Sequence, residues 1–312
     1  MNFSSQRHLS GPERLKLFFA LSRTPHAVLD MATPCLAALL WLGAFPPLRV
    51  VLLGLITVFA GYTSVYALND VINHRSDREK VQQGGFQDAG NYLDGVMVRH
   101  PLAHGLIGLG ESLFWTTGWG VLAVAGAFML NPVCVLVFMS GCALETVYCL
   151  MWRVTWLRSI VSGAVKTSGA LAAVFAVDSH PSFSFLLFLF LWLFFWEIGG
   201  QNIPNDWADI EEDRRVQAKT IPVKFGPETA SVFIVCFLVI TPAVSYVLLR
   251  LTPYNFGLPY LTACLLAGIC LLLVPAFRLF KTRDRSHAIA LFNRASYYPL
   301  ALLVVVTARS LL

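Results

Sequence analysis

The sequence predicts an all-α membrane protein with nine transmembrane helices, and three observations support this fold class. First, 56% of the 312 residues are hydrophobic and only 13% are charged, and the mean hydropathy of +0.65 is outside the range of soluble globular domains. Second, apolar runs long enough to cross roughly 30 Å of hydrocarbon recur along the chain. Third, basic residues are concentrated in every second segment between these runs. We therefore expect a single membrane-embedded domain over residues 1–312.

The apolar runs define the expected elements in chain order. A transmembrane helix needs about 20 consecutive, mainly apolar residues. The runs that meet this length are residues 26–44, 49–69, 103–128, 132–150, 158–177, 183–203, 228–250, 256–279 and 287–310.

The basic residues test this assignment independently, because short cytoplasmic loops are enriched in Lys and Arg. Most of the 23 Lys and Arg residues precede the first run or follow the second, fourth, sixth and eighth, at Arg7, Arg14, Lys16, Arg23, Arg75, Arg78, Lys80, Arg99, Arg153, Arg158, Arg214, Arg215, Lys219, Lys224, Arg278, Lys281, Arg283 and Arg285. The other side keeps Arg49, Arg250 and Arg309. We expect a cytoplasmic N-terminus and a C-terminus on the opposite side.

Charge and cysteine content exclude other classes of function. The formal net charge of +5 follows from the sidedness of the loops and from attraction to anionic lipid, so it does not indicate a nucleic-acid partner. The seven Cys residues lie in apolar runs and form no C-x-x-C pair, which argues against a disulfide framework or a cysteine metal site.

Two long polar segments, residues 70–102 and 204–227, are predicted to be cytoplasmic loops or caps that carry the function. The first begins within NDVINHRSDR (residues 69–78), and the second contains NDWADIEEDR (residues 205–214). The pattern N-D-x-x-[N/D]-x-x-x-D-R therefore occurs twice, each time at the cytoplasmic end of an even-numbered run. This is an internal repeat.

The acidic residues of both motifs share one spacing. The positions i, i+3 and i+7 are occupied by Asp70, Asn73 and Asp77 and again by Asp206, Asp209 and Asp213. On a helix this spacing places each trio on one face. Carboxylates so close together repel unless cations neutralise them, and hard oxygen ligands suit Mg²⁺, which completes its coordination with water and phosphate oxygens. Two such faces could hold Mg²⁺ on both sides of a diphosphate. A solvent-exposed loop rich in charged side chains would explain either motif alone. It explains poorly why the two motifs share the same spacing, position and side of the membrane.

With these motifs the chain resembles the UbiA superfamily of intramembrane prenyltransferases. Members of that family are nine-helix bundles with two Asp-rich motifs at the cytoplasmic mouth of a central cavity. The resemblance extends beyond the motifs, to KTIPV (residues 219–223) with the following Phe-Gly, to PLAHG (residues 101–105) and to RTPH (residues 23–26).

The resemblance implies an enzyme that transfers a prenyl group from an isoprenyl diphosphate to an aromatic or lipid-like acceptor, with Mg²⁺ as cofactor. It implies metal ligands at Asn69, Asp70, Asn73, Asp77, Asp206, Asp209 and Asp213. Catalytic roles are implied for Asp70, Asp77, Asp209, Asp213 and Lys219. Substrate contacts are expected from Arg23, Arg78, Tyr148, Lys166 and Arg214.

The sequence departs from the family pattern in two places. Asn73 stands where the family usually has Asp, which removes a charge but keeps an oxygen ligand. Between Asp77 and Pro101 there are also extra residues rich in Gly and Gln. They form either a cap over the cavity mouth or a disordered insert.

Among the ionisable residues that fall inside predicted runs are Lys166, Arg294 and Glu145. Lys166 lies among small residues, where a charge is expected to face a cavity or a partner. Arg294 is near a helix end and can extend to the membrane surface. Glu145 lies about one turn from Tyr148, and either a cavity or a surface position is compatible with it.

Two alternatives stay open from sequence. A terpene cyclase on the same scaffold would ionise the diphosphate and let the prenyl chain capture its own cation. A transporter built from internal repeats is a further alternative, although carriers bind near the midplane of the membrane and these acidic residues are at its edge. The identity of the acceptor and the chain length of the donor are not predicted.

Overall fold

A computed structural model describes residues 10–86, 92–93 and 95–311 of the chain. In chain order its helices are α1 (Gly11–Leu21), α2 (Thr24–Asp30), α3 (Ala32–Leu42), α4 (Leu48–Gln82), α5 (Leu109–Leu130), α6 (Pro132–Leu150), α7 (Arg158–Val177), α8 (Phe183–Trp196), η1 (Glu197–Asn202), α9 (Ile203–Ala208), α10 (Ile210–Arg215), α11 (Ile221–Leu251), α12 (Leu258–Gly268), η2 (Ile269–Leu273), α13 (Val274–Thr282), α14 (Arg285–Ser296) and α15 (Tyr298–Ser310).

Within the described residues, nine helical segments are long and apolar enough to span a membrane. They are α2–α3, α4, α5, α6, α7, α8–η1–α9, α11, α12–η2–α13 and α14–α15. The predicted fold class is therefore confirmed.

Several spans differ in extent from the prediction, among them the sixth, which continues to Ala208, and the seventh, which begins at Ile221. Two of the differences bear on the acidic motifs and the segment between α4 and α5. The second does not end at residue 69, because α4 continues to Gln82 and carries the first acidic motif on an unbroken helix. The third begins at Leu109 and not at residue 103, because turns occupy the residues before it and Gly105 has a left-handed backbone (φ +72°). The first acidic motif therefore lies on one continuous helix together with the second membrane span.

Proline explains where several spans are interrupted. A proline within a helix lacks the amide hydrogen and its ring crowds the carbonyl four residues earlier. The break between α2 and α3, the π-helices η1 and η2, and the break between α14 and α15 each lie within a turn of such a residue, at Pro34, Pro204, Pro275 and Pro299. At the first break the hydroxyl of Thr33 donates a 3.0 Å hydrogen bond to the carbonyl of Asp30, which takes the place of the missing amide.

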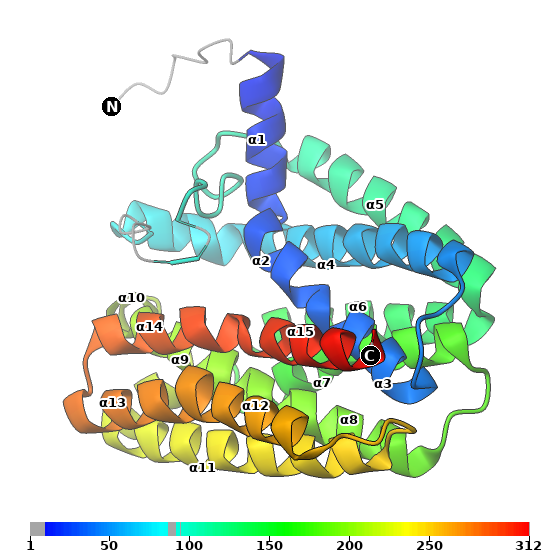
Figure 1. The fold of residues 1–312 in the computed structure, drawn as a ribbon. Helices are drawn as coiled ribbons and strands as arrows, with labels where there is room; N and C mark the ends of the chain where they lie inside the picture. Colours follow the sequence, from blue (N-terminus) through cyan, green and yellow to red (C-terminus); the bar gives the residue numbers. More distant parts are fainter. Residues whose placement is uncertain (1–9, 87–91, 94, 312) are drawn as a thin grey trace.

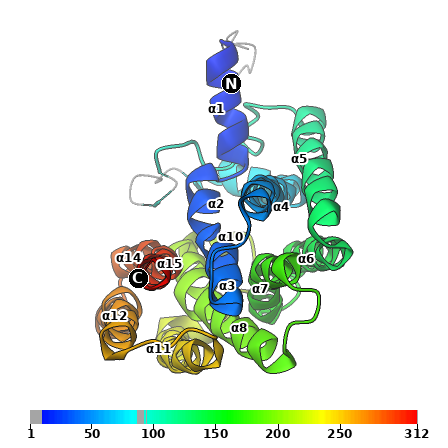
Figure 2. The same cartoon turned by 45° about the vertical axis from the view of Figure 1, so that its right-hand side comes forward.

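The helices follow one another around the molecule. In Figure 2, α4 and α5 lie on the upper right, α6 to α8 lie below them, and α11, α12 and α14 continue to the left. Neighbouring pairs pack closely, including α4 with α5, α6 with α7, α7 with α3 and α8 with α11. In Figure 1 the C-terminal end of α4, α10 and the start of α14 meet at the left end of the molecule. That end holds both acidic motifs.

Burial separates a core from a lipid-facing surface. The aromatic run of α8 supplies the centre of the core, where Phe185, Trp192 and Trp196 are fully buried. The indole of Trp196 donates a 2.9 Å hydrogen bond to the carbonyl of Ala295, which satisfies its polar group. Phe114 on α5 is 83% exposed, as expected for a side chain that faces lipid.

Candidate active site

The two acidic motifs lie together although they are far apart in sequence. Side chains from α4, α7, α9, α10 and the segment before α5 line one small polar cavity of about 80 Å³. We call its acidic residues, with the contacting Asp70, the mouth site: Asp70, Asp77, Asp206, Asp209 and Asp213. All five are buried. The predicted convergence of the two motifs is therefore seen in the structure.

In the first motif the unbroken helix α4 presents Asp70 and Asp77 on one face. The imidazole Nδ1 of His100 lies 3.2 Å from Asp70 Oδ1 and 3.3 Å from Asp77 Oδ2. The candidate ligand atoms of these three residues all lie within 4.8 Å of one another. Such a group has the size of a metal site.

In the second motif the helix is interrupted at Asp209, which ends α9 and precedes α10. Its backbone angles (φ −104°, ψ 15°) leave the helical region. A continuous helix was expected from the spacing. The break changes the direction of the chain between Asp206 and Asp213, yet both still line the polar cavity.

Each carboxylate of the second motif faces its own basic side chain. The pairs are Asp206 with Arg158 at 3.3 Å, Asp209 with Arg99 at 3.1 Å and Asp213 with Lys80 at 2.6 Å. In the first motif Arg23 lies 3.1 Å from Asp70. Buried charges of this kind are stable only when paired.

The pKa values of the residues outside the spans follow from these pairs. Burial alone would raise the pKa of the Asp209 carboxyl, but the charges of Arg99 and Lys80 outweigh it and hold that pKa below its usual value. Burial raises the pKa of the Asp213 carboxyl in spite of Lys80. For His100, burial would lower the pKa, but the two carboxylates of the first motif raise it above the usual value.

The mouth site has the chemistry of a cation site. Asp70 Oδ2 and Asp206 Oδ2 are buried and have no hydrogen-bond partner among the described residues. One such oxygen comes from each motif. Unsatisfied buried carboxylate oxygens are costly unless a ligand completes them, and carboxylate oxygens are the ligands that Mg²⁺ prefers. The residues present therefore fit a divalent cation.

Asn69 and Asn73 both reach this region. Asn69 Oδ1 accepts a 3.2 Å hydrogen bond from Arg23, and its amide donates at 2.5 Å to Glu145. The amide of Asn73 donates to Asn69 Oδ1 at 3.3 Å and to the sulfur of Cys149 at 3.4 Å. Asn69 lines both this cavity and the larger one described below.

Three predicted basic residues lie outside the site. Arg78, Arg214 and Lys219 are exposed, and none of them lines the polar cavity. Arg214 pairs instead with Glu211 at 2.9 Å. The backbone amide of Lys219 donates to the carbonyl of Trp152, and its exposed side chain does not line the cavity in which it was expected to bind the diphosphate.

Sequence reasoning missed the basic residues that occupy the site: Lys80, Arg99, His100 and Arg158. Lys80 follows Asp77 by three positions and so shares its helix face, which is a signal that could have found it. Arg158 begins α7, and nothing local marks it. Arg99 and His100 belong to the segment between α4 and α5, and only tertiary folding brings them to the carboxylates.

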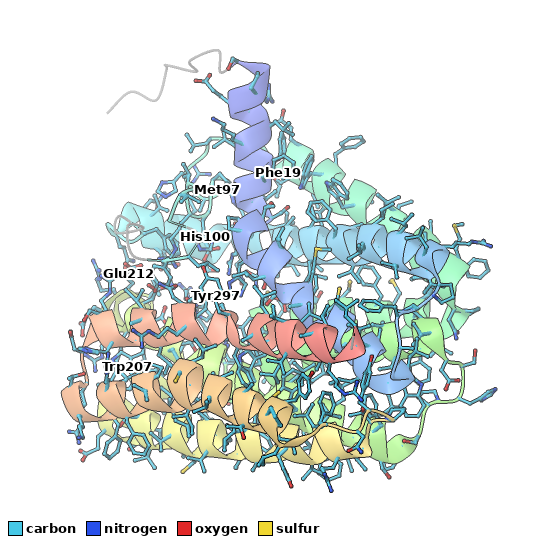
Figure 3. All side chains as sticks on the ribbon, viewed as in Figure 1. Phe19, Met97, His100, Trp207, Glu212 and Tyr297 are labelled. Carbon is cyan, nitrogen blue, oxygen red and sulfur yellow. The ribbon has the colours of Figure 1, made fainter. Side chains whose placement is uncertain are left out.

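That segment was interpreted as a cap or a disordered insert. Residues 87–91 and 94 lie outside the described residues. Among the rest, Phe86 stacks on the imidazole of His100 with ring centroids 4.3 Å apart, and the guanidinium of Arg99 lies 4.5 Å from the ring centre of Tyr92. His100 and Glu212, labelled in Figure 3, lie toward the end of the molecule that holds both acidic motifs, which we call the mouth end. The described part of the segment therefore contributes to the site.

A second, larger cavity of about 480 Å³ leads from the mouth site into the membrane-spanning region. Its volume is typical of a site for a small organic ligand. Arg23, Asn69, Tyr148 and Asn205 line both cavities and connect them. Small side chains on three helices give the cavity its width, including Gly61, Gly141, Gly169, Ala172 and Ala176.

Ionisable side chains line this cavity or contact a residue that lines it. We call them the inner polar cluster: Asp30, Tyr66, Lys166 and Glu197. Lys166 Nζ lies 2.5 Å from Asp30 Oδ2 and 3.8 Å from Glu197 Oε2. The hydroxyl of Tyr66 also donates to Asp30. Lys166 therefore faces the cavity, as expected for a charge within a span, and sequence reasoning did not identify its two acidic partners.

The remaining predicted residues are placed as follows. Glu145 is buried and lines the larger cavity rather than reaching the membrane surface. The hydroxyl of Tyr148 accepts a 3.0 Å hydrogen bond from Asn202, and its ring lies under the guanidinium of Arg158. Arg294 is exposed and lines neither cavity.

Comparison with known proteins identifies relatives of the chain. A model of the UbiA prenyltransferase family matches residues 31–298. A 4-hydroxybenzoate octaprenyltransferase of Shewanella denitrificans is 28% identical over 230 residues, which cover 72% of each chain. The enzyme of the same name from Shewanella woodyi is 26% identical over 225 residues, which cover 70% of this chain and 72% of that protein.

Solved structures share the fold. A UbiA homolog from Archaeoglobus fulgidus bound to GPP and Mg²⁺ has a TM-score of 0.67 at 17% identity, and the match covers 95% of this chain and 99% of that one. A UbiA homolog from Aeropyrum pernix has a TM-score of 0.68 at 18% identity, covering 92% of this chain and 97% of that one.

Proposed function

The chain belongs to the UbiA prenyltransferase family, and on that premise we propose that it uses Mg²⁺ to transfer a prenyl group from an isoprenyl diphosphate to an aromatic acceptor within the membrane. The observation that carries this proposal is the mouth site, where buried carboxylates of two motifs and their basic partners surround one polar cavity beside a large apolar one. The names of the relatives, which act on 4-hydroxybenzoate, support an aromatic acceptor.

The mouth site would hold the diphosphate of the donor. Asp70, Asp77, Asp206, Asp209 and Asp213 would bind Mg²⁺, with Asn69 and Asn73 as neutral oxygen donors. When bound, Mg²⁺ supplies positive charge that stabilises the diphosphate as a leaving group. The basic partners of the carboxylates would then turn to phosphate oxygens, with which they form charge-assisted hydrogen bonds.

The larger cavity would hold the prenyl chain and the acceptor. As the C–O bond of the donor breaks, its electron pair leaves with the diphosphate and an allylic cation remains. The rings of Tyr66 and Tyr148 line the cavity and stabilise such a cation through cation–π attraction. Apolar walls exclude the water that would otherwise capture it. A ring carbon of the acceptor then forms the new bond and loses its proton, for which Glu145, beside Asn69, is the proposed base.

We also propose that the mouth site opens to the cytoplasm and that the C-terminus lies on the other side. The support is the distribution of basic residues, because exposed Arg78, Arg153, Arg214 and Arg283 belong to segments at the mouth end. A fluorescent protein fused after Leu312 is expected to stay dark in a bacterial host, because it would be exported unfolded. Bright fluorescence would reverse the orientation.

The activity is tested on the purified protein in detergent with geranyl, farnesyl and geranylgeranyl diphosphate. We expect diphosphate release that requires both Mg²⁺ and a phenolic acceptor, and a prenylated phenol detected by mass spectrometry. Release without an acceptor, yielding a hydrocarbon, would support a cyclase instead. Release that persists at full rate after chelation of divalent cations would refute the role of Mg²⁺.

A further inference from the structure

We infer that the inner polar cluster, together with Asn202, is an acceptor-binding subsite that selects a neutral phenol bearing hydrogen-bond donors and rejects a carboxylate. This inference deepens the proposed function and rests on it for the identity of the ligand as an acceptor. It separates this chain from relatives named for 4-hydroxybenzoate, which carries a carboxylate.

The inner polar cluster contains two acidic side chains and one basic side chain. Lys166 is its one cation, and its ammonium already donates a 2.5 Å hydrogen bond to Asp30 and another at 3.1 Å to the hydroxyl of Tyr66. Glu197 adds a second carboxylate 3.8 Å away. An anionic ligand entering here would meet two acidic side chains and no uncommitted cation within the cluster. In a poorly solvated cavity such repulsion is large.

Two buried hydrogen-bond acceptors beside the cavity have no donor in the part of the chain that the structure describes. Glu197 is 8% exposed and Asn202 is 5% exposed, and both line the cavity. Glu197 Oε2 and Asn202 Oδ1 have no hydrogen-bond partner among the described residues, while Ser162 satisfies Glu197 Oε1 at 2.8 Å. A buried acceptor without a donor is costly. A ligand that carries O–H or N–H groups would satisfy both atoms.

The helical backbone is irregular next to both acidic residues of the inner polar cluster. Glu197 and Asn202 are the first and last residues of the π-helix η1, and π-helical turns are frequent at functional sites. The break between α2 and α3, close to Pro34, follows Asp30, whose carboxylate contacts Lys166 at the wall of the cavity. Two separate backbone irregularities thus lie next to the two acidic residues that face Lys166.

The position of the cluster suits an acceptor. At 1.5 Å per residue, Lys166 lies about 12 Å further along α7 than Arg158, which pairs with Asp206 in the mouth site. An aromatic ring fits in this interval, with one edge toward the reactive carbon of the donor and its polar substituents toward the cluster. An entirely apolar ligand would leave Glu197 Oε2 and Asn202 Oδ1 without hydrogen-bond donors.

The test compares two ligands that differ in charge but not in shape, 4-hydroxybenzamide and 4-hydroxybenzoate. Binding of each is measured by equilibrium dialysis on the full chain in nanodiscs without donor. We expect the amide to bind at least tenfold more tightly than the carboxylate. We also expect Glu197→Gln and Asp30→Asn to weaken amide binding and to narrow this preference at least threefold. Glu228→Gln is the matched control, because Glu228 is an exposed glutamate paired with Arg283.

Equal binding of the two ligands, or tighter binding of the carboxylate, would overturn the inference. So would a preference that is unchanged in both cluster variants. Turnover is followed separately, with each compound offered as acceptor together with Mg²⁺ and geranyl diphosphate. Absence of diphosphate release with every acceptor would refute the proposed function, whereas the binding preference alone decides the inference.

Discussion

The mouth site and the inner polar cluster are both buried groups of charged residues, but they balance charge in different ways. In the mouth site each carboxylate faces a basic side chain, and these basic residues come from four separate segments of the chain. In the inner polar cluster two carboxylates share Lys166. A ligand that brings both signs of charge, such as a metal diphosphate, can exchange with the pairs of the mouth site. The inner polar cluster suits a neutral ligand that donates hydrogen bonds.

The largest effect should come from removing one mouth carboxylate. Asp209→Asn is expected to lower kcat at least about a hundredfold, because a carboxylate that would hold the Mg²⁺ stabilising the leaving group is lost. Diphosphate release measures this. The control is Glu211→Gln, an exposed acid of the same motif, which should retain nearly full activity. Near-full activity of Asp209→Asn would remove this residue from the metal-binding group.

A basic residue of the mouth site should have the next largest effect. Arg99→Gln is expected to raise KM for the prenyl diphosphate about tenfold to a hundredfold, the range for a charge-assisted hydrogen bond. Arg214→Gln provides the comparison, because Arg214 is exposed and pairs with Glu211. Equal effects of the two variants would show that Arg99 does not contact the donor.

Asn73→Asp should have a smaller effect than the two substitutions above. It should strengthen Mg²⁺ binding rather than impair activity. An additional carboxylate beside Asp70 and Asp77 is expected to tighten Mg²⁺ binding severalfold. The activity of both proteins is titrated with Mg²⁺ at fixed donor concentration. If the half-saturating concentration stays the same, Asn73 is not a ligand.

Lys219→Ala should have the smallest effect. The sequence resemblance assigned a catalytic role to Lys219, but its side chain is exposed and does not line the polar cavity. A change of less than about twofold in kcat/KM is expected, within the range of ordinary surface substitutions. A loss comparable to that of Arg99→Gln would restore the role predicted from sequence.

The spans and the acidic residues of the mouth site could be predicted from the sequence, whereas most of its basic residues could not. Apolar length and basic-residue asymmetry predicted the nine spans, because both follow from the bilayer acting on every segment in the same way. The acidic residues of the mouth site were predicted because their spacing is local. Of its basic residues only Arg23 was predicted, because residues such as Arg99 and Arg158 reach the carboxylates only through the folded chain.

The inner polar cluster was predicted only in part. Lys166 was noticed because a charge inside an apolar run is rare. Asp30 and Glu197 lie near the ends of runs, where a carboxylate can also face water, so their positions gave no signal. Asp30 lies next to the break beside Pro34, Glu197 begins the π-helix beside Pro204, and both carboxylates face Lys166 in the folded chain. Proline placement together with an acidic residue would have been the usable sequence signal.

The most direct test of the account is to measure donor and acceptor binding separately in two variants. Geranyl diphosphate with Mg²⁺ and 4-hydroxybenzamide are each titrated alone into nanodiscs that contain Asp209→Asn or Glu197→Gln. The account predicts that Asp209→Asn weakens donor binding at least tenfold and leaves the amide within twofold, and that Glu197→Gln does the reverse. If either variant weakens both ligands equally, the two regions do not form separate donor and acceptor sites, and the account is contradicted.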